Sequence, residues 1–87
     1  MIVKNLEGRS GRPVVNQYSI AFDGIEVFQS YNTVIACIKD KILYIDKIKY
    51  SRTTSKYLNA WIRDHARKYE KIEKISNSEL LEILKIA

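Results

Sequence analysis

The apolar residues of this chain change their spacing at Tyr50, and that change limits the folds that the chain can form. Before Tyr50 they recur at every second residue or in short β-branched runs, as in strands that bury one or both faces. After Tyr50 they recur at intervals of three and four residues, as on one side of a helix. A block of strands followed by helix is typical of the α+β class.

Four strands, joined by short turns, are expected in the first part of the chain. The pattern places them at residues 14–22, 25–30, 33–38 and 42–48. Asp23-Gly24 is the strongest turn signal, because both central residues of a type I′ turn need positive φ. Tight turns are also expected at residues 31–32 and 39–41. The segment is therefore predicted to form an antiparallel meander of about four strands.

A long amphipathic helix is expected after the last of these strands. Ser51-Arg52-Thr53-Thr54-Ser55 is rich in the residues that cap helix N-termini. Leu58 is followed by apolar, histidine or aromatic side chains 3, 4, 7 and 11 residues later, which form one stripe over about four turns. Lys56, Arg63 and Arg67 fall on the opposite side of this helix.

The two ends of the chain are less regular. The pattern is compatible with a short strand at Ile2–Lys4 before a loop, and residues 70–75 fit either an extension of the helix or a short strand. Ser76 and Glu79 form a capping-box pattern before a short, strongly apolar final helix. We therefore expect a single domain over residues 1–87: an antiparallel sheet of about four strands, one long amphipathic helix packed on one sheet face, and a short C-terminal helix.

The positive charge of the chain is concentrated in one segment. The chain has 15 Lys and Arg residues against 10 Asp and Glu, a formal net charge of +5. Eight of the basic and two of the acidic residues lie between Lys47 and Lys71, so this segment carries +6 and the rest carries −1. A surface that binds phosphate or an acidic protein is therefore expected there.

The candidate binding residues lie at the start of the predicted helix and along its basic side. Hydroxyl side chains, free backbone N–H groups and Arg52 at a helix N-terminus together favour an anion. A redundant helix cap and a solvated helix face are the alternatives for the same residues. The predicted partner-binding or nucleic-acid-binding residues are Tyr50, Arg52, Thr53, Thr54, Lys56, Arg63 and Arg67. Arg9 and Arg12 form a second, smaller basic cluster in the N-terminal loop.

Catalytic and metal-binding patterns are weak in this sequence. His65 is the only histidine and Cys37 the only cysteine, so no set of ligands occurs at metal-binding spacing. Cys37 lies in the most apolar predicted strand, where an inert thiol is expected. Asp40 and Asp46 flank one strand and are expected to be charges at the edge of a hairpin. We therefore expect a protein that is not an enzyme and has no cofactor or metal.

The predicted compartment is the cytoplasm. No apolar run approaches the roughly 20 residues that span a bilayer, and the first residues lack the apolar stretch of a secretion signal. A single cysteine excludes an internal disulfide and fits a reducing compartment. No membrane partner is expected.

Two segments, residues 30–36 and Tyr50–Asn59, resemble small uncharacterised proteins of phages and plasmids of Gram-positive bacteria. The second segment has the pattern Tyr-Ser-x-Thr-Thr-Ser-Lys-x-Leu-Asn, and the resemblance covers roughly Ser30 to Trp61. Proteins of such elements that lack catalytic residues are similar to stoichiometric inhibitors of host defence, such as anti-CRISPR proteins. The resemblance thus implies an inhibitor that binds a host nucleoprotein complex. The basic charge of the chain argues against simple mimicry of DNA.

Two other functions remain open from the sequence. One is direct binding of a nucleic acid through the same basic residues. The other is a homodimeric protein-interaction module, formed through the apolar final helix or through an open sheet edge.

Overall fold

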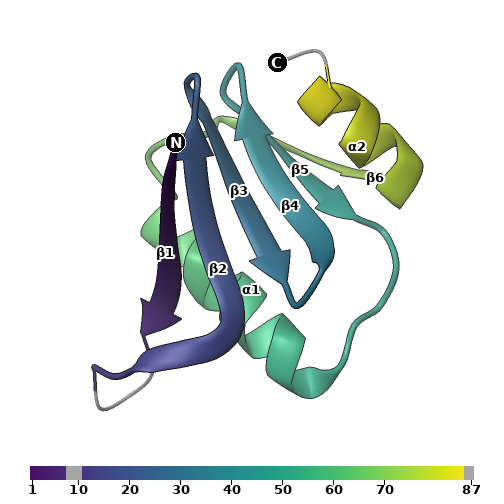
Figure 1. Ribbon diagram of the computed structural model, residues 1–87. Helices are drawn as coiled ribbons and strands as arrows, with labels where there is room; N and C mark the ends of the chain where they lie inside the picture. The colour runs from purple at the N-terminus through teal and green to yellow at the C-terminus, as the bar shows by residue number, and fades with distance from the viewer. Residues whose placement is uncertain (8–10, 86–87) are drawn as a thin grey trace.

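The chain forms one six-stranded sheet with a helix on each side, with α1 behind the sheet and α2 in front of it in Figure 1. The computed structural model describes residues 1–7 and 11–85. The elements are β1 (Ile2–Glu7), β2 (Pro13–Phe22), β3 (Ile25–Ser30), β4 (Thr33–Lys39), β5 (Ile42–Asp46), α1 (Arg52–Asp64), β6 (Lys71–Ile75) and α2 (Asn77–Lys85). The strands lie in the sheet in the same order as in the chain.

β1 to β5 form an antiparallel meander, in which tight turns join β2 to β3, β3 to β4 and β4 to β5. Asp23 and Gly24 have φ values of 46° and 78°, and Asp40 and Lys41 have φ values of 52° and 64°. Positive φ at both central residues is the requirement of a type I′ turn, which matches the twist of the flanking strands. The predicted hairpin at Asp23-Gly24 is therefore confirmed.

Gly24 provides a test of this turn. No atom lies within 4 Å of the position that a Cβ would occupy, so an added methyl group brings backbone strain without a clash. We expect Gly24→Ala to lower the free energy of unfolding by about 1 kcal/mol in urea denaturation. Gly24→Asn is the matched control, because Asn tolerates positive φ. Equal losses in the two variants would contradict the assigned turn type.

The expected fold is wrong in three respects. The sheet has six strands rather than about four, it is mixed rather than antiparallel, and it has helices on both faces. β6 pairs with β5 in the parallel direction, with Leu43 opposite Ile72. Residues 71–75 therefore form an edge strand (Figure 1). The sequence pattern was compatible with either helix or strand for this segment.

α1 is also shorter than the expected helix. It ends at Asp64, and the backbone N–H of His65 donates to the carbonyl oxygens of Trp61 and Ile62 at 3.1 and 3.2 Å. The chain then turns back, and the backbone N–H of Glu70 donates to the carbonyl of Lys41 at 2.7 Å. This bond starts β6 beside β5. Periodicity could not reveal it, because it joins residues far apart in the sequence.

The α1 side of the sheet holds the larger hydrophobic core. Trp61 is 1% exposed and lies against Phe28, with 6.0 Å between the ring centroids. The indole N–H of Trp61 donates to Ser19 Oγ at 3.0 Å, which satisfies the polar atom that the ring buries. The other buried members of this core are Ile35, Ala36, Ile38 and Leu43.

α2 packs on the opposite face, mainly over β4 and β5. Its Leu80 is fully buried, in a second core with Ile25, Val27 and Cys37. Glu79 N–H donates to Ser76 Oγ at 3.2 Å, and Ser76 Oγ donates to the Glu79 carboxylate at 3.0 Å. Ser76 is therefore the helix cap as predicted, but the Glu79 carboxylate bonds to the Ser76 hydroxyl and not to its backbone N–H, as it would in a full capping box. Neither α1 nor α2, the helices of the described residues, has the length and apolar character needed to cross a lipid bilayer.

Candidate functional site

The solvent side of α1 carries a row of basic side chains. Arg52, Lys56 and Arg63 are exposed, and they occupy helix positions i, i+4 and i+11, which project from one side. The buried residues Thr54 and Trp61 lie on the other side. With a rise of 1.5 Å per residue, this basic stripe (Arg52, Lys56 and Arg63) is about 16 Å long.

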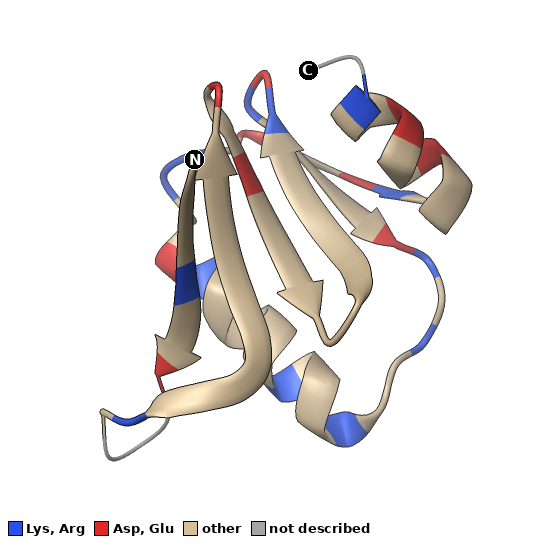
Figure 2. Cartoon of the chain, in the orientation of Figure 1, with Lys and Arg blue, Asp and Glu red and all other residues tan. Residues whose placement is uncertain are grey.

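The loop between β5 and α1 enlarges the positive area. Lys47 and Lys49 in this loop are exposed, and Figure 2 shows the basic positions continuing from the loop onto α1. We call these two lysines and the basic stripe together the basic surface. Within the described ranges, no carboxylate lies within 4.0 Å of any of its five cationic groups. Its charge is therefore available to an external anion.

Two of the predicted binding residues face inward instead. The hydroxyl of Tyr50 donates to Asp46 Oδ2 at 2.6 Å, and burial together with this carboxylate raises the pKa of Tyr50 to about 12. Thr54 is 7% exposed, and its Oγ1 lies 3.3 Å from Ser30 Oγ and accepts a hydrogen bond from Ser51 Oγ at 3.2 Å. Tyr50 and Thr54 thus hold the start of α1 against the sheet.

The remaining predicted residues are exposed, but they do not form one row. Ser51 is the helix cap, since its Oγ accepts from the backbone N–H of Thr54 at 3.3 Å. Thr53 is the exposed hydroxyl beside Arg52. Arg67 lies in the turn beyond the end of α1 and so leaves the line of the basic stripe. Of the N-terminal arginines, Arg12 is exposed and Arg9 lies outside the described residues.

The turn between β3 and β4 lies beside the first turn of α1, which the sequence did not indicate. Ser30 contacts Thr54, and the next residue, Tyr31, is 61% exposed with a φ of 55°. Its backbone N–H donates to the carbonyl of Asn16 at 2.7 Å. Positive φ is uncommon for a bulky residue, so these contacts hold an exposed aromatic ring near the basic surface. The two segments that carry the phage-protein resemblance meet at this point.

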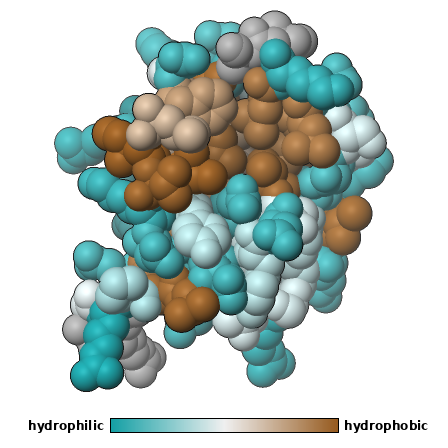
Figure 3. All heavy atoms as spheres, viewed as in Figure 1, coloured by the Kyte–Doolittle hydropathy of each residue, from teal (hydrophilic) through white to brown (hydrophobic). Residues whose placement is uncertain are grey.

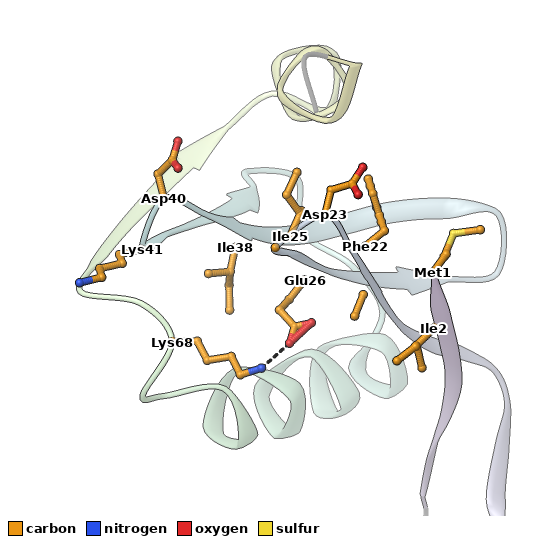
Figure 4. A pocket seen from close by; sticks show the side chains of 12 residues that line it. Met1, Ile2, Phe22, Asp23, Ile25, Glu26, Ile38, Asp40, Lys41 and Lys68 are labelled. Carbon is orange, nitrogen blue, oxygen red and sulfur yellow. Dashed lines mark hydrogen bonds and ion pairs between the residues drawn. The ribbon is translucent and has the colours of Figure 1, made fainter.

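His65 belongs to a separate polar cluster on the α1 side. Lys68 Nζ lies 2.5 Å from Glu26 Oε1, and His65 Nε2 lies 3.9 Å from the same oxygen. His65 Nδ1 lies 2.7 Å from the carbonyl oxygen of Trp61, so Nδ1 carries the proton and donates. Figure 4 shows Glu26 and Lys68 joined across a groove of about 590 Å³. Among the described residues, Glu26 is the carboxylate that pairs with His65 and Lys68, so this cluster lacks the paired carboxylates of a general acid and base.

Nucleophilic and metal-binding groups are equally limited. Cys37 is fully buried. Its burial raises the pKa of the thiol to about 11, and the nearby Lys39 only partly opposes this. The thiol is therefore inert. Within residues 1–7 and 11–85, no three His, Cys, Asp or Glu side chains come together as metal ligands do.

A comparison with known families identifies the family of this chain. The sequence model of DUF8033, described as a family of unknown function, matches residues 1–77. The chain belongs to this family. The matched region contains α1 and all six strands of the sheet, and it ends at the start of α2. No curated protein and no solved structure matches the chain. Membership of DUF8033 assigns no activity, so the function has to come from the geometry.

Proposed function

We propose that this protein is a non-enzymatic binding protein that holds the nucleic-acid backbone of a host nucleoprotein complex through its basic surface. The observation that carries the proposal is the basic stripe on α1. Exposed helices commonly balance their basic residues with acids three or four positions away. In α1 the only acidic residue is Asp64, at the C-terminal end. The unbalanced charge of Arg52 and Lys56 is what a phosphate backbone would neutralise.

The surroundings of Arg52 suit a phosphate in three ways. Arginine presents a planar fork of donors that matches phosphate oxygens. The N-terminus of α1 adds the positive end of the helix dipole, and Thr53 adds an exposed hydroxyl. Tyr31 offers an exposed ring on which an unpaired base can stack. Together these features favour a nucleic acid over an acidic protein.

The resemblance to phage and plasmid proteins extends this proposal. A small protein that binds the guide or target nucleic acid of a host defence complex would occupy the channel that the complex needs. We therefore propose a stoichiometric inhibitor of the anti-CRISPR kind, working in the cytoplasm of the host cell. Its positive charge makes it a ligand for the nucleic acid rather than a mimic of it.

The test of the basic surface is charge reversal. We expect the triple variant Arg52→Glu, Lys56→Glu, Arg63→Glu to bind a fluorescent single-stranded RNA at least about tenfold more weakly than the wild type. With three phosphate contacts, the logarithm of the wild-type binding constant should fall with the logarithm of salt concentration with a slope of about −2. The slope should approach zero in the variant. Fluorescence anisotropy titrations at several salt concentrations measure both quantities.

The control is a triple reversal elsewhere, Lys41→Glu, Lys74→Glu, Lys85→Glu, which makes the same change in net charge at three exposed positions. Equal weakening by both triple variants would show that only net charge matters and would contradict the proposal. Pull-downs from lysate of the natural host, with and without nuclease, then separate the two uses of the surface. Loss of every partner on nuclease treatment would favour direct nucleic-acid binding over a defence complex.

A further inference from the structure

β1 is an exposed edge of the sheet. Among the described residues it is paired with β2 alone, and Met1, Ile2 and Val3 are 89%, 60% and 54% exposed. Edge strands are usually protected by charged side chains, proline or a covering element. The opposite edge, β6, has such protection, with Lys71, Glu73 and Lys74 among its five residues. β1 has fewer charged residues, Lys4 and Glu7 among six, and begins with the apolar pair Ile2 and Val3.

The β2–β3 hairpin determines which backbone groups of β1 point outward. The two-residue turn at 23–24 closes with a hydrogen-bonded pair, Phe22 and Ile25. In an antiparallel pair of strands, such pairs recur at every second residue. β2 therefore directs the backbone groups of Phe22 and Ile20 toward β3, and those of Ala21 and Ser19 toward β1.

The register between β1 and β2 then identifies the free groups. Ile2 is opposite Ala21 and Lys4 is opposite Ser19, so the backbone N–H and C=O of Ile2 and Lys4 are used inside the sheet. The alternating residue Val3 has its backbone N–H and C=O on the outer side. The same holds for Asn5. β1 thus presents a short ladder of donors and acceptors that a second antiparallel strand can complete.

We propose that two copies of this chain associate through β1, in antiparallel pairing, with Val3 of each copy opposite Val3 of the other at a two-fold axis. This register uses the outward backbone groups of Val3 and places Ile2 opposite Lys4 of the second copy. Moving the axis to Lys4 would place two lysines opposite each other, which is unfavourable. The inference does not depend on the proposed nucleic-acid binding.

The apolar side chains of β1 support a second copy as the occupant. The side chain of Val3 lies on the α2 side of the sheet, next to its register partner Ile20. Figure 3 shows a broad hydrophobic area over the upper part of this face. In the proposed register the two Val3 side chains lie side by side and join the apolar areas of the two copies. Contact through α2 is less favoured, because Leu80 is already fully buried within its own chain.

The other face of the sheet is compatible with the same register. Ile2, Ala21 and Glu26 form a row across β1, β2 and β3 on the α1 side. Lys4 of the second copy would extend this row at Ile2, next to the groove in Figure 4. The carboxylates of Asp23 and Asp40 also line that groove, but they point to the α2 side. On the α1 side its carboxylate is Glu26, which is already paired with Lys68.

The geometry also stops the assembly at two copies. Pairing through β1 uses that edge in both copies and closes the two-fold axis, and the remaining β6 edges carry charged residues. A two-fold axis perpendicular to the joined sheet keeps both α1 helices on the same face. The two basic surfaces would then point to the same side. Only the use of both surfaces by one nucleic acid rests on the proposed function.

The expected affinity is modest. The surface area that each copy would bury by pairing one short strand, together with its apolar neighbours, is smaller than the roughly 800 Å² per partner of a standard interface. We therefore expect a dissociation constant on the order of 10 μM. The full chain, without nucleic acid, should change from monomer to dimer in analytical ultracentrifugation between about 1 and 500 μM. A monomer throughout this range would overturn the proposal.

The variant Val3→Lys tests the interface, because it would place two ammonium groups at the axis. We expect its dimer to dissociate at concentrations at least about tenfold higher than those of the wild type. Val15→Lys is the matched control, since Val15 is 74% exposed and lies on β2. Equal dimerisation of Val3→Lys and the wild type would place the contact elsewhere and overturn the proposal.

Hydrogen exchange of the wild type gives a test without substitutions. Raising the protein concentration through the dimerisation range should slow exchange of the Val3 and Asn5 amides. It should leave Lys4 unchanged, because that amide is already bonded to β2. Slowing at Lys4 without slowing at Val3 would contradict the register.

Discussion

Trp61→Ala is expected to lower the free energy of unfolding by about 3–5 kcal/mol, enough to unfold much of the protein. Trp61 is 1% exposed and lies between Phe28 and His65, with ring-centroid distances of 6.0 and 4.3 Å. Alanine would leave a cavity at the centre of the core that joins α1 to the sheet, and it would free Ser19 from its bond to the indole. Urea denaturation followed by circular dichroism measures the loss.

Trp61→Phe separates the two contributions of this side chain. Phenylalanine keeps most of the apolar volume and removes the indole N–H, so we expect a loss of about 1–2 kcal/mol. Similar losses for Trp61→Phe and Trp61→Ala would mean that the hydrogen bond to Ser19, and not the packing, holds α1 in place. A loss below about 1 kcal/mol for Trp61→Ala would contradict the placement of α1 on the sheet.

The second large effect is expected at Asp46. The substitution Asp46→Ala should lower the free energy of unfolding by about 3 kcal/mol. Asp46 is 4% exposed at the end of β5. Its carboxylate accepts three hydrogen bonds: from Ile48 N–H at 3.0 Å, from the Tyr50 hydroxyl at 2.6 Å and from Asn77 Nδ2 at 2.9 Å. One side chain thus joins the sheet to the segment before α1 and to the start of α2. Tyr50→Phe removes one of these bonds and should cost about 1 kcal/mol.

The contribution of Asp46 should depend on pH. Burial raises the pKa of this carboxyl, but the hydrogen bonds from Tyr50, Ile48 and Asn77 lower it by more, so it lies below its ordinary value of 3.8. Folding therefore favours the ionised form. The stabilisation is complete above 3.8 and is lost as the pH falls through the lowered value. The difference in free energy of unfolding between the wild type and Asp46→Ala should therefore become smaller as the pH falls through this lowered pKa. A difference that does not change with pH would contradict the role of the charge.

Local signals in the sequence correctly located several elements. Asp23-Gly24 forms the predicted turn, and Ser76 caps α2 as predicted. The start of α1 lies within the predicted cluster of cap-forming residues, at Ser51. Each of these features depends on contacts between residues at most four positions apart, and the residue types that make such contacts are visible in the sequence.

The candidate site was predictable only in part. Arg52, Lys56 and Arg63 are exposed together because helical periodicity alone places them on one side. Tyr50 and Thr54 match the pattern of a binding turn equally well, yet both bond to groups of the sheet. Asp46 precedes Tyr50 by four residues, but Ser30 precedes Thr54 by 24 positions. No local pattern could have paired Ser30 with Thr54.

The sequence by itself determined the turns, the helix starts and the concentration of positive charge in one segment, because these depend on neighbouring residues. The tertiary structure decided that residues 71–75 form a strand, since they extend only by parallel pairing with β5. It also decided that α1 ends at Asp64 and that the two helices cover opposite faces of the sheet. These outcomes depend on hydrogen bonds and packing between distant residues, whose partners are chosen only when the whole sheet assembles.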